Sequence, residues 1–121
     1  MLKILIVDDD VSITELMKTL LKMEGYEAIA INDSLQAMDI AKSLNPDLIT
    51  LDLMMPGLTG FELCKMFNGD PNFSNTPIII ISAKDDPESK RQALDSGAKE
   101  YLTKPFLVDD LIGTIQSLTE S

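Results

Sequence analysis

Residues 77–82 read Pro-Ile-Ile-Ile-Ile-Ser, and the four consecutive isoleucines at 78–81 form the most apolar of the short segments in the chain. An uninterrupted apolar run of this length is typical of a strand that is buried on both faces, as in a parallel sheet covered by helices. Similar segments, mostly rich in aliphatic or β-branched residues, recur along the chain. They predict five strands: Leu2–Val7, Tyr26–Ile31, Asp47–Leu51, Pro77–Ser82 and Lys99–Thr103.

The segments between these strands have the apolar spacing of amphipathic helices, and most have recognisable ends. Residues that cap helix N-termini open four of them, at Ser12-x-x-Glu15, Ser34, Thr59-x-x-Glu62 and Asp86-Pro87. Residues that stop a helix follow three of them, at Gly25, Asn45-Pro46 and Gly97. The fifth helix is predicted from apolar residues at helical spacing: Val108, Leu111, Ile112, Ile115 and Leu118.

Strands and helices therefore alternate five times, which predicts an α/β fold of doubly wound (βα)5 type. Such an order gives a parallel sheet with right-handed crossovers and helices on both faces. The fourth helix differs from the others because, between Glu88 and Ser96, its only apolar residues are Ala93 and Leu94. A helix with so little apolar surface to bury is a candidate moving part.

The composition indicates one globular domain over residues 1–121 and narrows its possible partners. Acidic residues outnumber basic ones 20 to 10, and a net charge of −10 disfavours direct binding to nucleic acid. No apolar stretch approaches the roughly 20 residues of a membrane helix, and the N-terminus does not resemble a secretory signal. We therefore expect a cytoplasmic protein without membrane contact. Cys64 has no partner for an internal disulfide, and the absence of histidine argues against a zinc site.

Polar residues of a particular kind follow four of the five predicted strands. They are Asp8, Asp9 and Asp10 after the first, Asp52 after the third, Ser82 at the end of the fourth, and Thr103-Lys104-Pro105 at the end of the fifth. Ligands of open parallel sheets bind beyond the carboxyl ends of the strands. The sequence therefore predicts that carboxylates, a hydroxyl and an ammonium group converge at one edge of the sheet. No glycine-rich nucleotide-binding motif accompanies them.

This set of side chains has the chemistry that phosphoryl transfer needs. Clustered carboxylates repel one another unless a cation neutralises them, and a few carboxylates with a backbone carbonyl suit Mg²⁺. One aspartate would remain free to attack phosphorus as a nucleophile. Lys104 would add positive charge to the phosphoryl oxygens, and the Ser82 hydroxyl would add a hydrogen bond.

At these positions the chain resembles the receiver domains of response regulators in two-component signal transduction, along its whole length. The matching segments are residues 4–10 (Ile-Leu-Ile-Val-Asp-Asp-Asp), 51–57 (Leu-Asp-Leu-Met-Met-Pro-Gly), Gly60, 81–83 (Ile-Ser-Ala), Gly97-Ala98 and Lys104-Pro105-Phe106. Each is weak alone, but all of them in order form a specific pattern. The resemblance implies the flavodoxin-like fold, with a five-stranded sheet of order 2-1-3-4-5.

The resemblance also implies roles for individual residues. Asp52 would be the phosphoacceptor, and Asp8 and Asp9 would hold Mg²⁺ or Mn²⁺ together with Asp52 and the backbone carbonyl of Met54. Asp10 is open to two interpretations, a metal ligand or, as the sequence favours, a cap of the first helix.

The remaining implied roles concern phosphate binding and switching. Ser82, the backbone N–H of Ala83 and Lys104 would contact the phosphoryl group, and the bond from Lys104 to Pro105 is expected to be cis. Tyr101 would repack inward when Ser82 moves toward the phosphoryl group, although ordinary strand packing is the alternative for this ring.

The partners implied are a histidine kinase or histidine phosphotransfer protein and a downstream effector. The family's activity is Mg²⁺-dependent self-phosphorylation from a donor and autodephosphorylation, in a monomer that could dimerise on phosphorylation. The charges on the face of the fourth helix, fifth strand and fifth helix differ from those of winged-helix regulators, since residues 99–100 read Lys-Glu and position 114 is Thr. Two alternatives are a phosphorylation-independent binding module and an aspartyl phosphatase, which Met54 disfavours because those enzymes have a second acid there.

Overall fold

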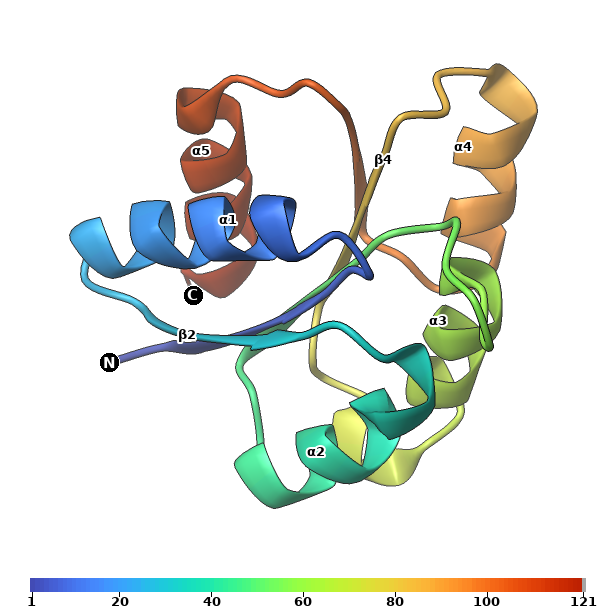
Figure 1. The fold of residues 1–121 in the computed structure, drawn as a ribbon. Coiled ribbons are helices and arrows are strands. Elements are labelled where there is room, and N and C mark those ends of the chain that lie inside the picture. Colours follow the sequence, from blue (N-terminus) through green and yellow to red (C-terminus); the bar gives the residue numbers. More distant parts are fainter. Residues whose placement is uncertain (121) are drawn as a thin grey trace.

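The computed structural model describes residues 1–120, in which five strands alternate with five α-helices (Figure 1). In chain order they are β1 (Lys3–Val7), α1 (Val11–Met23), β2 (Glu27–Ile31), α2 (Ala37–Leu44), β3 (Leu48–Leu51), α3 (Gly60–Asn68), β4 (Ile78–Ser82), α4 (Pro87–Asp95), β5 (Glu100–Thr103) and α5 (Val108–Thr119). Short 3₁₀ segments η1 (Ser34–Gln36) and η2 (Pro71–Phe73) precede α2 and β4. Every strand begins one residue later than predicted and ends where predicted. Among residues 1–120, no helix is both long and apolar enough to cross a membrane.

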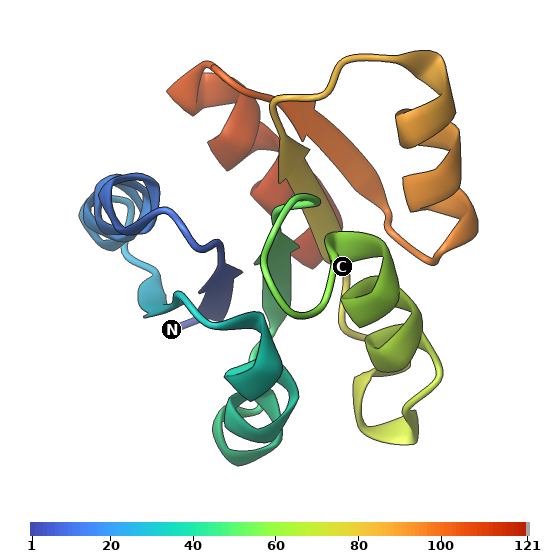
Figure 2. The same cartoon turned by 45° about the vertical axis from the view of Figure 1, so that its right-hand side comes forward.

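The strands form one parallel sheet of order β2-β1-β3-β4-β5, which confirms the doubly wound, flavodoxin-like prediction. Helices α1 and α5 cover one face of the sheet, and α2, α3 and α4 cover the other (Figures 1 and 2). The order reverses between β1 and β3, since β2 lies outside β1 and the later strands add on the other side. This is the place where open α/β sheets bind ligands.

The isoleucine run of β4 contributes to the cores on both faces of the sheet. Ile79 and Ile81 pack in the cluster beneath α1 and α5, whereas Ile78 and Ile80 belong to the cluster beneath α2, α3 and α4. All four side chains are at most 2% exposed. The inference from the sequence, a central strand buried on both faces, is therefore confirmed.

The first helix is capped by Asp10, and the predicted capping box beginning at Ser12 is wrong. The Asp10 carboxylate accepts hydrogen bonds from the backbone N–H groups of Ser12 and Ile13, at 3.0 and 3.3 Å. Asp10 has the extended backbone of an N-cap, so the helix has already begun when the chain reaches Ser12. Of the two interpretations of Asp10, the structure confirms the helix cap.

The prediction that Ser34 caps the second helix is also wrong. Asp33 caps the short η1 segment instead, and α2 begins only at Ala37. The buried Ser34 hydroxyl donates to the Pro56 carbonyl at 2.7 Å and accepts from the Leu58 N–H at 2.9 Å. Ser34 thus fixes the loop after β3 and does not cap a helix.

The other predicted helix ends are confirmed. Thr59 and Glu62 form a reciprocal capping box at the start of α3, and the Asp86 carboxylate accepts from the Ser89 N–H to open α4. Left-handed or otherwise positive-φ residues follow three helices: Gly25, Asn45 and Gly97.

Gly60 lets the start of α3 approach the strand end that carries Asp52. Its N–H donates to the Leu53 carbonyl at 3.0 Å. A Cβ at position 60 would lie 2.9 Å from the carbonyl carbon of Asp52 and closer still to its oxygen. Because these are backbone atoms, no side-chain rotation could relieve the collision.

We therefore expect Gly60→Ala to lower the free energy of unfolding by about 1–3 kcal/mol through overpacking. Gly113→Ala is the matched control, because a Cβ on this exposed residue of α5 meets no atom within 4 Å. Because alanine has a higher helix propensity than glycine, Gly113→Ala should raise stability by roughly 0.5–1 kcal/mol. Urea denaturation of both variants measures the difference, and a Gly60→Ala protein as stable as the wild type would contradict this account.

Candidate functional site

The carboxyl ends of the strands bring the acidic residues together through the register of the sheet. Val7 of β1 lies opposite Leu51 of β3, so Asp8 and Asp52 leave the sheet as neighbours. The Asp52 N–H still donates to the Val7 carbonyl at 3.0 Å. Figure 2 shows the strand arrows pointing toward this end of the molecule, where the loops to α1, α3, α4 and α5 begin.

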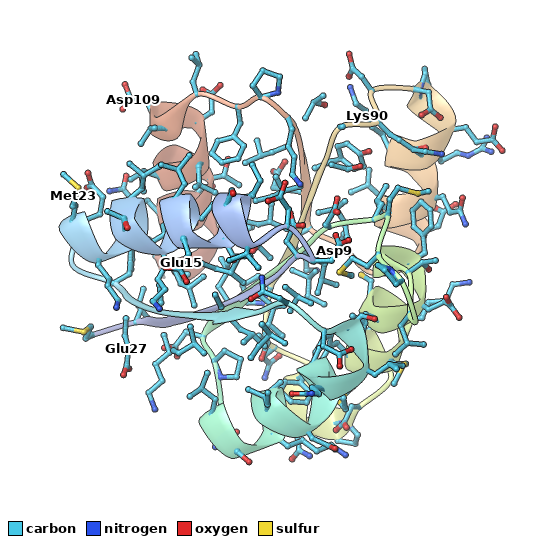
Figure 3. All side chains as sticks on the ribbon, in the orientation of Figure 1. Asp9, Glu15, Met23, Glu27, Lys90 and Asp109 are labelled. Carbon is cyan, nitrogen blue, oxygen red and sulfur yellow. The ribbon has the colours of Figure 1, made fainter. Side chains whose placement is uncertain are left out.

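The carboxylates of Asp8, Asp9 and Asp52 form a compact cluster. One oxygen from each lies within 4.8 Å of the others. Asp8 and Asp52 are buried, at 4% and 9% exposure, whereas Asp9 is exposed at the tip of the loop (Figure 3). Three carboxylates at this separation, two of them shielded from water, are the donor set of a hard divalent cation. The side chains present therefore fit such an ion.

Lys104 directly follows β5 and reaches the carboxylate cluster from that end of the strand order. Ser82 pairs with Thr103 at the ends of β4 and β5, and the Lys104 N–H donates to the Ser82 carbonyl at 2.8 Å. The Lys104 ammonium then lies 2.6 Å from an oxygen of Asp8 and 3.6 Å from one of Asp52. The peptide bond that follows, to Pro105, is cis.

The environment of Asp52 disfavours its ionised form. Burial is the main reason that the pKa of Asp52 is raised above its ordinary value, and the charge of Asp8 adds to the effect. The Lys104 ammonium and the N–H of Leu53, which donates to the Asp52 carboxylate at 2.9 Å, act in the opposite direction without cancelling it. Negative charge at Asp52 is thus held in place at a cost.

Ser82 and Tyr101 meet at the segment that leads into α4. The buried Ser82 hydroxyl accepts from the Lys84 N–H at 3.2 Å, and the Tyr101 hydroxyl donates to the Lys84 carbonyl at 2.7 Å. The Tyr101 ring is partly buried against the core beneath α2, α3 and α4. The next residue, Asp85, accepts from Thr103 at 3.2 Å and pairs with the Lys90 ammonium at 2.7 Å.

The structure brings together five of the predicted side chains in the carboxylate cluster or beside it: Asp8, Asp9, Asp52, Ser82 and Lys104. Met54 lies in the loop after β3, with 61% of its surface exposed, and Ala83 is exposed directly after β4. Asp10 is outside the carboxylate cluster.

Sequence reasoning missed the contacts made by Asp85 and those of Asn32 and Thr14 near Asp8. No local spacing pattern marks these residues, because their partners lie on other strands and helices.

Asp52→Asn tests the cost of the buried charge, since the amide oxygen can still accept from the Leu53 N–H. Because the pKa of Asp52 is higher in the folded state than its ordinary value of 3.8, ionisation destabilises the folded protein. This cost is absent below the unfolded pKa, grows as the pH rises through both values, and is complete above the folded pKa. We expect Asp52→Asn to raise the free energy of unfolding at pH 7, without metal, because the substitution removes this cost.

Urea denaturation in a chelator at pH 7 and at pH 5 measures this gain, which should be no larger at the lower pH. Asp39→Asn is the control, because Asp39 is exposed in the first turn of α2, where negative charge is favourable, and its neutralisation should not raise stability. A loss of stability in Asp52→Asn at pH 7 would show that the charge is not costly.

Comparisons with known proteins agree with this geometry. The family model of the response regulator receiver domain matches residues 4–116. The chain is 37% identical over 115 residues to the DNA-binding response regulator MtrA of Mycobacterium tuberculosis, covering 95% of this chain and 49% of MtrA. It is 38% identical over 116 residues to the DNA-binding dual master transcriptional regulator RpaA of Synechocystis, covering 96% and 48%. The chain thus spans about half the length of these relatives.

Solved structures give the same result for the fold. Chemotaxis protein CheY4 of Vibrio cholerae is 34% identical, with a TM-score of 0.92 over 98% of both chains. The receiver domain of the Francisella response regulator 1452 is 38% identical, with a TM-score of 0.91 over 99% of this chain and 98% of that one. Since the family model and these relatives cover nearly all of the chain, it belongs to the receiver domain family of response regulators in two-component signalling.

Proposed function

We propose that this chain is a phosphorylation-dependent switch in which Asp52 accepts a phosphoryl group beside a bound Mg²⁺. The observation that carries the proposal is that Asp52 lies beside the buried Asp8 carboxylate, with the Lys104 ammonium 3.6 Å from one of its oxygens. At this position, a bound cation and the Lys104 ammonium would together offset the negative charge of a phosphoryl group that is transferred to Asp52. Membership of the receiver family supports the same role.

Asp8, Asp9 and Asp52, with the backbone carbonyl of Met54, would hold the ion. Mn²⁺ would suit the same oxygen ligands. When bound, the ion supplies positive charge to the phosphoryl oxygens and relieves the repulsion among the carboxylates. Lys104, now paired with Asp8 at 2.6 Å, would supply the second positive charge to the phosphoryl group.

The chemical step belongs to Asp52. One of its carboxylate oxygens would form a bond to phosphorus while the bond from phosphorus to the donor breaks, and the donor leaves with that electron pair. Residues 1–121 contain no histidine, so a phosphohistidine donor must lie outside this sequence, and we expect it in a histidine kinase or a histidine phosphotransfer protein. A small-molecule phosphodonor would serve the same purpose. Slow loss of the phosphoryl group to water would reset the switch.

The readout would pass through Ser82 and Tyr101 to α4 and β5. The hydroxyl of Ser82, the last residue of β4, and the N–H of Ala83, the residue after it, would form hydrogen bonds to the phosphoryl oxygens. Because the Lys84 backbone bonds to both Ser82 and Tyr101, a shift of Ser82 would be felt by the ring. Among the residues of α4 only Ser89 and Ala93 are buried, so this helix can move at small cost. A downstream effector would read the face formed by α4, β5 and α5, as a monomer or as a dimer formed on phosphorylation.

Incubation with Mg²⁺ and acetyl phosphate should add one phosphoryl group to the wild type and none to Asp52→Asn, as followed by intact-mass spectrometry. Beryllofluoride with Mg²⁺ should shift the NMR signals of Tyr101 in the wild type alone. Equal responses from the wild type and Asp52→Asn would contradict the proposal and favour a phosphorylation-independent binding module.

Lys104→Met should slow phosphoryl uptake by about 100-fold, because it removes one preorganised positive charge from the transition state. Lys99→Met is the matched control, since Lys99 is an exposed lysine that lies outside the carboxylate cluster. Time courses of phosphorylation at fixed Mg²⁺ and acetyl phosphate give both rates. If the two variants react equally fast, Lys104 has no part in the reaction.

A further inference from the structure

The end of β2 contributes a side chain that holds the acidic loop after β1. In a parallel pair the hydrogen bonds alternate between the two strands, and the last one here runs from the Asp8 N–H to the Ile31 carbonyl, at 3.1 Å. The next donor along β2 would be the N–H of Asp33. At that point the chain has turned into η1, and the side-chain amide of Asn32 donates to the Asp8 carbonyl instead, at 2.9 Å.

The same amide also reaches the first helix. It donates to the hydroxyl oxygen of Thr14 at 2.9 Å, and that hydroxyl donates to the Val11 carbonyl at 3.1 Å. Thr14 is fully buried. Asn32 therefore connects three elements at one point, namely the end of β2, the loop after β1 and the first turn of α1.

The contacts in this region fix the residues on either side of Asp9 but leave the Asp9 carboxylate itself without a partner among residues 1–120. In the loop of residues 8–10, the Asp10 N–H donates to the Asp8 carboxylate at 2.9 Å, and the Asp10 carboxylate caps α1. Both neighbours of Asp9 are thus fixed, while in the part of the chain that the structure describes the Asp9 carboxylate makes no hydrogen bond or ion pair. Only the backbone on either side holds Asp9 within reach of Asp8 and Asp52.

We propose that Asn32 and Thr14 are positioning residues for the metal site, which hold the loop of residues 8–10 so that Asp9 completes the carboxylate cluster. The inference rests on the proposed function in one respect, that a divalent cation binds there. Loss of an outer hydrogen bond to a metal ligand commonly weakens binding by 10–100-fold. Here the bond acts on the backbone of the loop, so the effect should be at the lower end.

The test is a titration of the metal-free protein with Mg²⁺ alone, followed by the backbone NMR signals of Asp9 and Leu53. Asn32→Leu, which removes the amide at similar size, and Thr14→Val, which removes the hydroxyl, should each raise the Mg²⁺ dissociation constant roughly tenfold. Thr14→Ser keeps the hydroxyl and should stay within twofold of the wild type.

Gln36→Leu is the matched control, because its exposed amide donates only to Asp33, at 3.3 Å, and not to the loop of residues 8–10. A second measurement separates positioning from general destabilisation. In a chelator, amide hydrogen exchange at Asp10 should be faster in Asn32→Leu than in Gln36→Leu, with exchange in the strands unchanged.

Asn32→Leu and Thr14→Val proteins that bind Mg²⁺ as tightly as Gln36→Leu would overturn this inference alone, provided that the wild type binds Mg²⁺. A wild type that binds no Mg²⁺ would overturn both the inference and the metal site of the proposed function. Weaker binding accompanied by faster exchange throughout the strands would assign Asn32 a structural role and contradict the positioning role.

Discussion

Repulsion among carboxylates that the sheet forces together is the constraint on which the site depends. The register that places Val7 opposite Leu51 makes Asp8 and Asp52 neighbours. Burial removes most of the water that would screen the repulsion between their charges. The backbone pairing of β1 and β3 supplies the stability that holds the two charges together. An edge built in this way favours a ligand that brings positive charge, and a cation bound there would in turn offset the negative charge of a transferred phosphoryl group.

The surroundings of the cluster relieve this repulsion only in part. Lys104 pairs closely with Asp8 but remains 3.6 Å from Asp52, and the pKa of Asp52 stays raised because burial outweighs the favourable contacts. The same edge extends through Ser82 to the Lys84 backbone and the ring of Tyr101. These contacts connect the strand ends beside Asp52 with the segment that leads into α4, a helix with few buried residues. Local electrostatics and weak anchoring together make a switch physically reasonable.

The sequence predicted the parts of the molecule that depend on local patterns. Strand burial and the convergence of Asp8, Asp52, Ser82 and Lys104 followed from apolar runs and the residues at their ends, whereas the sheet order followed from the resemblance to receiver domains. The predictions failed where two neighbouring residues could perform the same task, as when Asp10 caps α1 in place of Ser12. The bridge from Asn32 could not be predicted, because it depends on where β2 leaves the sheet relative to β1 and on a partner in α1.

The most direct test of the central claim is the thermal stability of the protein as a function of Mg²⁺ concentration. A ligand that binds only the folded state stabilises it by RT ln(1 + [L]/Kd). If the carboxylate cluster is a cation site, the melting temperature of the wild type should rise steadily with the logarithm of Mg²⁺ concentration above the Kd, and that of Asp9→Asn should rise much less. A wild type whose melting temperature does not respond to Mg²⁺, or responds no more than Asp9→Asn, would contradict the account.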